Sequence, residues 1–178
     1  MSISLFDSPP DFDQPIAVLK HCHDRIRKQL TTLQNMLAHL PEHGADIDAQ
    51  NGAAAVLRYF SNAAAQHHAD EEQDLLPMLR ATAGADDAAI LEALLPEIVQ
   101  EHLQMEAIWL VLAPELKLLA SGTSPALSAD GVRQFVALYT AHMEKEEAHV
   151  APMAKRLFSP AQMAQLGQAM KNRRGIGN

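Results

Sequence analysis

The sequence predicts an all-α protein: an up-down-up-down four-helix bundle with a short closing helix at its C-terminus. Apolar residues make up 48% of the 178 residues and aromatic residues only 4%, and Ala, Leu and Gln recur throughout, which is typical of helices. Four long segments repeat apolar residues at steps of three and four. Short links between these segments favour antiparallel neighbours, and the length suits one domain with a buried core.

The first helix is expected to follow an extended leader. Residues 1–12 include two adjacent prolines, which disfavour helix. Asp13 is a candidate N-cap, and Pro15 is tolerated in a first helical turn. The amphipathic pattern then continues to about Leu40, and a single polar residue, His23, interrupts its apolar stripe.

The second helix is expected to begin at a cap formed by Asp46 or Asp48. Partway along it, the apolar stripe becomes polar at two residues of metal-ligand type, His67 and Glu71. Pro77 is expected to kink or end this helix, because proline lacks the N–H that an interior turn needs. An Ala-Gly pair then makes the turn to the third helix.

The third helix is expected to begin near Asp86 or Asp87, and Pro96 should either kink it or begin a new helix. The fourth follows a cap at Ser128. The closing helix should cover roughly 160–171, because a Ser-Pro pair precedes it. The main domain is therefore predicted over residues 13–171, with a flexible tail at 172–178.

One motif occurs twice, as QHHADEEQDLLP and AHMEKEEAHVAP. Each copy has a His, a Glu four residues later, a second Glu directly after it, and a Pro ten residues after the His. Residues four apart project from one face of a helix, so the His and first Glu of each copy should point the same way. The second glutamates, Glu72 and Glu147, should point elsewhere. His102 and Glu106 form a third such pair without the second Glu.

These stripe positions predict a two-metal site in the bundle interior. Seven side-chain ligands are too many for one first-row metal and suit two metals that share carboxylates. Imidazole and carboxylate without thiolate favour iron or manganese, with zinc possible. Buried carboxylates are rare unless paired or metal-bound, which argues against a chance arrangement. The predicted ligands are His23, His67, Glu71, His102, Glu106, His142 and Glu146.

The remaining candidates receive other interpretations. Glu72 and Glu147 are expected to be solvated or to support the ligands from outside. His149 falls on the predicted stripe one turn beyond Glu146 and is interpreted as a partner of the site. The other histidines are expected at the surface, namely His21, His39, His43 and His68.

Charge and composition exclude several classes of protein. The net charge of −8, without a basic cluster, argues against nucleic-acid binding. The N-terminus has neither the basic start nor the apolar core of a signal peptide, and the apolar runs are far shorter than the ~18 residues of a membrane span. A single cysteine, Cys22, excludes an internal disulfide and fits a reducing cytoplasm.

The motifs resemble the hemerythrin-like, or HHE cation-binding, family over roughly residues 13–171. The matching segments are CHDRI, HHADEEQDLLP, EHLQME, HMEKEEAHVAP and SPAQMAQLGQAM. The resemblance implies a non-haem, usually di-iron, centre of two iron ions with oxo, hydroxo or carboxylate bridges. It implies Glu71 and Glu146 as bridges, and as terminal ligands His23, His67, His102 and His142.

The sequence departs from the oxygen-carrying hemerythrins at two points. Glu106 stands where they have a second His, and Glu146 follows His142 by four residues instead of five. Both changes argue against simple reversible oxygen carriage. The resemblance then implies a protein that binds or senses O2, NO or peroxide or handles iron, as a monomer or homodimer, more a metal-binding protein than a dedicated enzyme. The alternatives are an iron–sulfur cluster repair protein, a ferritin-like iron oxidase, and an interaction protein with a vestigial site.

Overall fold

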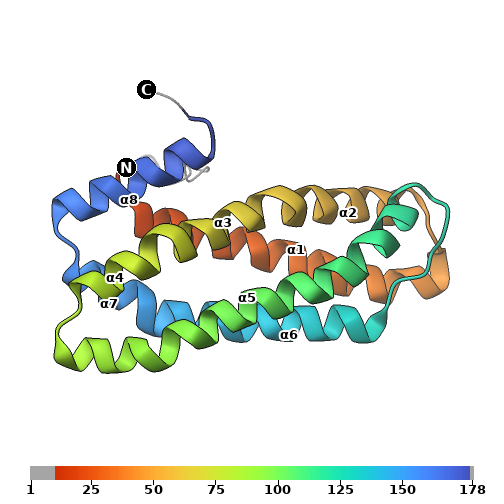
Figure 1. Ribbon diagram of the computed structural model, residues 1–178. Coiled ribbons are helices and arrows are strands. Elements are labelled where there is room, and N and C mark those ends of the chain that lie inside the picture. Colours follow the sequence, from red (N-terminus) through yellow and green to blue (C-terminus); the bar gives the residue numbers. More distant parts are fainter. Residues whose placement is uncertain (1–10, 177–178) are drawn as a thin grey trace, which may run out of the picture.

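Four long helical segments lie side by side and run alternately in opposite directions in the computed structural model, which describes residues 11–176 (Figure 1). This confirms the predicted up-down-up-down bundle, and no strand occurs among the described residues. Most of the expected leader and the last two residues of the expected tail lie outside the described residues. Within the described range, no helix combines the length and apolar composition needed to cross a bilayer.

The first segment is a single helix, α1, which spans Pro15–His43. Its N-cap is Gln14, one residue later than predicted, and Pro15 occupies the first turn. The helix continues past Leu40 to His43, with Pro41 in its last turn. It ends at Gly44, whose φ of 62° suits glycine and whose N–H donates to the Leu40 carbonyl.

The second segment runs from residue 47 to residue 82 without a break, and it contains two wider π-turns. The Asp46 carboxylate caps it by accepting a hydrogen bond from the Ala49 N–H at 2.9 Å, so Asp46 is the cap. The structure excludes an end of the helix at Pro77, one of the two predicted outcomes, because helix continues for five residues beyond it. The successive parts are α2 (Ile47–Arg58), η1 (Tyr59–Ala64), α3 (Ala65–Asp70), η2 (Glu71–Leu75) and α4 (Leu76–Thr82).

The third segment is α5, Ala85–Ala120, which runs through Pro96 without a new start. Ser128 caps the fourth segment, as predicted, by accepting a hydrogen bond from the Gly131 N–H at 3.1 Å. This segment again contains a π-turn between two α-helical parts. Its parts are α6 (Ala129–Lys145), η3 (Glu146–Val150) and α7 (Ala151–Leu157).

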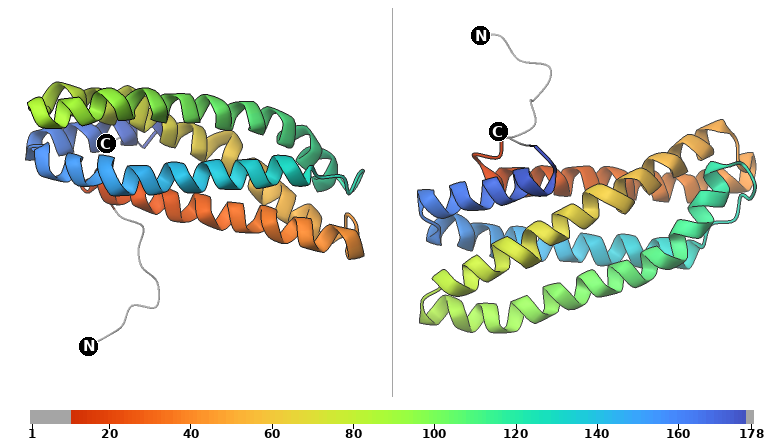
Figure 2. Two further views of the ribbon diagram at one scale, coloured as in Figure 1. Left: turned by 90° about the horizontal axis from the view of Figure 1, so that it is seen from below. Right: turned by 45° about the horizontal axis from the view of Figure 1, so that its top comes forward.

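The closing helix α8 spans Pro160–Arg173, two residues longer than predicted, and Ser159 begins it with a capping box. It contacts α1, α3 and η2, and both views of Figure 2 place it at the end of the bundle where α1 begins. A Cβ at Gly167 would lie 2.0 Å from the Phe12 carbonyl oxygen. Glycine at this position therefore lets the chain before α1 pack directly on α8.

The core consists of two apolar clusters, one in each half of the bundle. The Phe135 cluster includes Ile26, Leu33, Val56, Phe60, Met105, Leu112, Phe135 and Met143. The Leu79 cluster includes Leu19, Leu75, Leu79, Leu91, Ile98, Val150 and Leu166. Each long segment passes from one cluster to the other at its predicted site, as α1 does at His23. The polar residues of that site therefore lie between two apolar layers.

Candidate metal centre

The four histidines predicted as ligands come from four different helical segments and meet between the two clusters. None of their side chains is exposed to a significant extent, and the same holds for the two glutamates of the duplicated motif. The exposed fractions are 3% for His23, 1% for His67, 4% for His102, 1% for His142, 1% for Glu71 and 3% for Glu146. Six ionisable groups thus face one another in a medium of low dielectric constant, where charge must be compensated.

Both copies of the motif contain a π-turn that begins at the first Glu, at Glu71 in η2 and at Glu146 in η3. In each turn, the N–H five residues later donates to the carbonyl of that Glu. The wider turn accommodates the proline that follows it, which lacks an N–H and would crowd the preceding carbonyl. It also changes the helical phase, so that Val150 is buried and His149 is exposed. The sequence interpretation of His149 as a partner of the site is therefore wrong.

The four histidines and two glutamates form two groups, and within each group the ligand-type atoms lie within 4.8 Å of one another. The first group consists of His23, His67, Glu71 and Glu146. The second consists of Glu71, His102, His142 and Glu146. Both glutamates therefore belong to both groups, as expected for carboxylates that bridge two metal ions.

Glu71 presents a different oxygen to each group. Its Oε1 lies 3.2 Å from His67 Nε2, and its Oε2 lies 3.5 Å from His102 Nε2. Burial, together with the nearby carboxylate of Glu146, holds the pKa of Glu71 well above its usual range.

Glu146 presents one oxygen, Oε2, to both groups, at 3.2 Å from His23 Nε2 and 3.4 Å from His142 Nε2. Burial alone would raise the pKa of Glu146, but the adjacent imidazole of His23 and the nearby charges of His142 and His102 lower it below its usual value. The environment of the two carboxyl groups thus shifts the pKa of Glu71 upwards and that of Glu146 downwards.

Three of the four histidines have an Nδ1 atom bonded to a carboxylate outside the two groups. A carboxylate accepts hydrogen bonds, so each Nδ1 carries the proton and each Nε2 directs a lone pair at the centre. The three pairs are His23–Glu147 at 2.9 Å, His102–Glu72 at 2.6 Å and His142–Glu101 at 2.8 Å. Glu72 and Glu147 therefore lie outside the donor groups and support them, as expected, whereas Glu101 was not anticipated.

Several buried polar atoms of the centre lack hydrogen-bond partners, as expected for atoms that bind metal ions. Six buried atoms have no hydrogen-bond partner: His23 Nε2, both ring nitrogens of His67, Glu71 Oε2 and both carboxylate oxygens of Glu146. A buried polar atom without a partner costs roughly 1–3 kcal/mol. Burial also holds the pKa of His67 well below its usual range, which keeps the ring neutral, as a metal ligand must be. Imidazoles and shared carboxylates fit two first-row cations.

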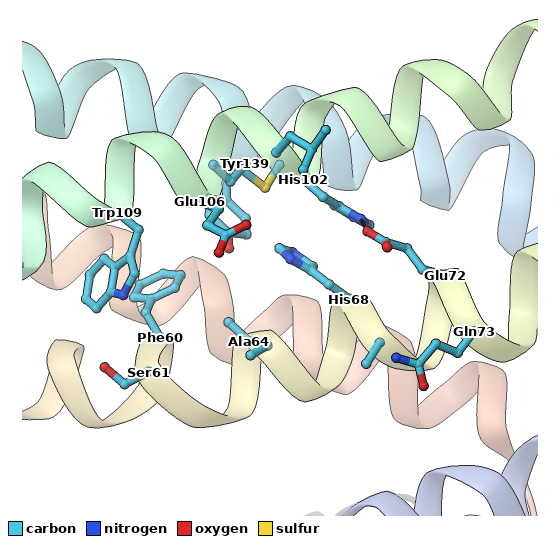
Figure 3. A pocket seen from close by; sticks show the side chains of 14 residues that line it. Phe60, Ser61, Ala64, His68, Glu72, Gln73, His102, Glu106, Trp109 and Tyr139 are labelled. Carbon is cyan, nitrogen blue, oxygen red and sulfur yellow. Dashed lines mark hydrogen bonds and ion pairs between the residues drawn. The ribbon is translucent and has the colours of Figure 1, made fainter.

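Glu106 is not brought together with the other predicted ligands. It belongs to neither donor group, and its side chain is exposed in a pocket of about 400 Å³ (Figure 3). The buried position that follows His102 in α5 is Met105, three residues on, and Glu106 lies about 100° further round the helix. The His-x-x-x-Glu spacing is the same as in the duplicated motif, but this face of α5 is turned towards the pocket.

His68, expected at the surface, lies largely buried beside the centre. Its ring stacks on that of His102, with 3.9 Å between ring centroids and 12° between planes. Its Nε2 is buried without a hydrogen-bond partner, and burial lowers the pKa of this imidazole well below its usual range. In sequence, His68 is only the neighbour of a stripe residue, so no periodic signal points to it.

Asp70 is a second buried residue that the sequence analysis did not identify. Its carboxylate is fully buried and pairs with Arg174 at 2.6 Å and with Arg173. Arg173 also pairs with Asp74 at 2.6 Å. These ion pairs tie the end of α8 to the first copy of the motif, so at least residues 173 and 174 of the expected flexible tail are held in place.

The fold and the site define a class of protein: a four-helix bundle with a buried candidate metal centre built from histidines and shared carboxylates. Residues 14–154 match the hemerythrin HHE cation binding domain, and the chain belongs to that family. This confirms the resemblance inferred from the motifs. An uncharacterized protein of Haemophilus influenzae is 26% identical over 165 residues, which cover 93% of this chain and 92% of that protein.

Proposed function

We propose that this protein holds two iron ions and uses them to bind or sense a small ligand, namely O2, NO or peroxide, with iron handling as a related role. The observation that carries the proposal is that Glu71 and Glu146 belong to both donor groups. A single-metal site would not need two shared carboxylates. Membership of the HHE cation-binding family supports a metal centre, and donors of imidazole and carboxylate suit iron, with manganese or zinc as alternatives.

Each group offers four donor residues, whereas iron commonly takes six ligands. Iron ions bound there would supply redox chemistry and coordination positions for a small molecule. The protein itself would orient the imidazoles through Glu72, Glu101 and Glu147 and keep bulk water out with the apolar clusters on either side. The single cysteine favours the reducing cytoplasm as the place of action.

A ferritin-like iron oxidase ranks below this proposal. Such proteins carry Glu-x-x-His pairs that face the bundle interior. Glu146 and His149 form such a pair in sequence, but His149 is exposed.

An iron–sulfur cluster repair protein would use a similar set of ligands. An assay for repair of damaged iron–sulfur clusters would distinguish this alternative from the proposed function.

The test is metal analysis of protein purified without oxygen from iron-replete cells, followed by its spectrum before and after exposure to air or NO. We expect two iron ions per chain and a change in near-ultraviolet and visible absorption with at least one gas. A His67→Ala/His142→Ala variant, which removes one donor from each group, should show neither. The proposal would be contradicted if the protein took up only zinc and if the spectrum of its iron-loaded form did not change with air or NO.

A further inference from the structure

Two pockets reach the candidate centre from different sides, and they differ in the charged residues that line them. The first, about 400 Å³, ends at His102 and contains the carboxylates of Glu72 and Glu106, with no lysine or arginine among the described residues that line it. We call it the acidic pocket. The second, about 500 Å³, reaches the other donor group. Lys20 and Lys155 line it together with Glu147 and the two shared glutamates, and we call it the lysine pocket.

Glu106 and His68 extend into the acidic pocket from opposite walls, α5 and α3, and the ends of their side chains face each other (Figure 3). Glu106 is exposed to solvent, whereas His68 is largely buried and its Nε2 has no hydrogen-bond partner. The two residues thus offer a carboxylate oxygen at the open side and an imidazole nitrogen at the inner side. Neither belongs to the two groups that share Glu71 and Glu146.

His68 also adjoins the centre itself. Its ring stacks on His102, and one ring nitrogen from each of His68, His102 and His142 lies within 4.8 Å of the other two. A cation that leaves Glu106 for His68 would therefore arrive beside two imidazoles of the second donor group. The donor types change along this path from carboxylate to imidazole, and both are ligands of first-row divalent ions.

From this arrangement we propose that the acidic pocket is the route by which a divalent metal ion reaches the centre, with Glu106 and His68 as transient ligands that pass it to His102. The inference rests on the proposed function, because it assumes that the centre takes up metal. Carboxylates at the mouth of a pocket concentrate cations and raise their association rate, by tenfold or more at low ionic strength. At the other pocket, Lys20 and Lys155 offset the charge of Glu147 and so reduce the attraction of that pocket for cations.

The experiment measures how fast metal-free protein takes up Co²⁺ in a stopped-flow instrument. Visible absorption of Co²⁺ reports its final ligands, and the single tryptophan, Trp109, lines the acidic pocket and reports by fluorescence on the arrival of the ion. We expect Glu106→Gln to slow uptake about tenfold at low ionic strength and much less at 0.15 M salt, where charge is screened. His68→Gln should slow it as well. The final stoichiometry and cobalt spectrum should equal those of the unchanged protein.

Two variants serve as controls. Glu92→Gln removes the same charge from another exposed position of α5, outside the acidic pocket, and should leave the rate within about twofold. Lys155→Gln should also leave it unchanged, whereas faster uptake in this variant would assign the route to the lysine pocket. Unchanged uptake in Glu106→Gln would overturn the proposal, and so would an altered final spectrum, since Glu106 would then be a permanent ligand. A chain that binds neither Co²⁺ nor Fe²⁺ would overturn the proposed function itself.

Discussion

The Nε2 atoms of His102 and His142 lie 3.1 Å apart and face each other across the centre. Carboxylates hold the Nδ1 protons of both rings, so both Nε2 atoms carry lone pairs. Two lone pairs at this distance repel each other unless a cation lies between them. A shared proton can fill that role in the metal-free chain, and a metal ion that both imidazoles bind would replace it.

The first prediction concerns Glu101, which bonds to His142 and also pairs with Lys145. Glu101→Gln should lower metal affinity about 10- to 100-fold, because the imidazole loses the charge that orients it and makes it more basic. Titration of metal-free protein with a competing chelator would measure this. Glu97→Gln is a matched control, since Glu97 also pairs with Lys145 but contacts no ligand-type histidine. Equal losses in both variants would show that only the lysine pairing matters.

The second prediction concerns removal of the metal. At neutral pH the metal-free protein should unfold at a lower temperature, because the unpartnered donors and the two shared carboxylates are then uncompensated. Free metal at 100 times its Kd would stabilise the fold by about 2.7 kcal/mol, or roughly 5–10 °C in Tm for a chain of this size. Calorimetry with and without chelator tests this, with the His67→Ala/His142→Ala variant as a control for the chelator. Equal melting temperatures for the two forms would show that metal does not stabilise the folded chain.

The duplicated motif could be found in the sequence because helical spacing alone places His67 with Glu71 and His142 with Glu146. The same spacing also predicted Glu106 as a ligand, but Glu106 lies outside both donor groups. Whether the third or the fourth residue after a histidine faces inward depends on the rotation of the helix about its axis relative to its neighbours. This rotation cannot be predicted from the local sequence. The presence of Met105 at the third position was the only hint.

The π-turns could also not be predicted from the sequence. A proline inside a helical pattern normally predicts a kink or an end, which is how Pro77 was interpreted. In the structure, the wider turn of η2 lets the helix continue through the proline and keeps both Glu71 and Leu76, five residues later, buried. The contacts of Asp70 with the end of α8 could not be predicted from a local pattern either, because they join residues about a hundred positions apart in the chain.

The third prediction concerns the ion pairs of Asp70 with the end of α8. Asp70→Asn should destabilise the fold by about 3 kcal/mol, because two mostly buried guanidinium groups lose their shared carboxylate. Asp74→Asn is the matched control: Asp74 pairs with Arg173 alone and is more exposed, so the loss should stay below about 1 kcal/mol. Urea unfolding of both variants gives the comparison. Equal small effects would mean that α8 does not depend on Asp70.

The last prediction concerns pH and the pair of Asp87, at the start of α5, with Arg156 in α7. The two guanidinium nitrogens of Arg156 lie 2.6 and 3.0 Å from the Asp87 oxygens, and this hydrogen bonding lowers the pKa of Asp87 below its usual value of 3.8. A carboxyl whose pKa is lower in the folded chain stabilises the fold above its unfolded pKa, and the effect disappears as pH falls through the folded pKa. Asp87→Asn should therefore lower the Tm of metal-free protein by a constant amount between pH 5 and 7, and the difference should shrink as the pH falls below 3.8. Asp86→Asn removes a charge from the same helical turn without an arginine partner, which controls for the helix dipole. A difference for Asp87→Asn that persists unchanged to the lowest pH at which the protein folds would show that packing, and not ionisation, stabilises this contact.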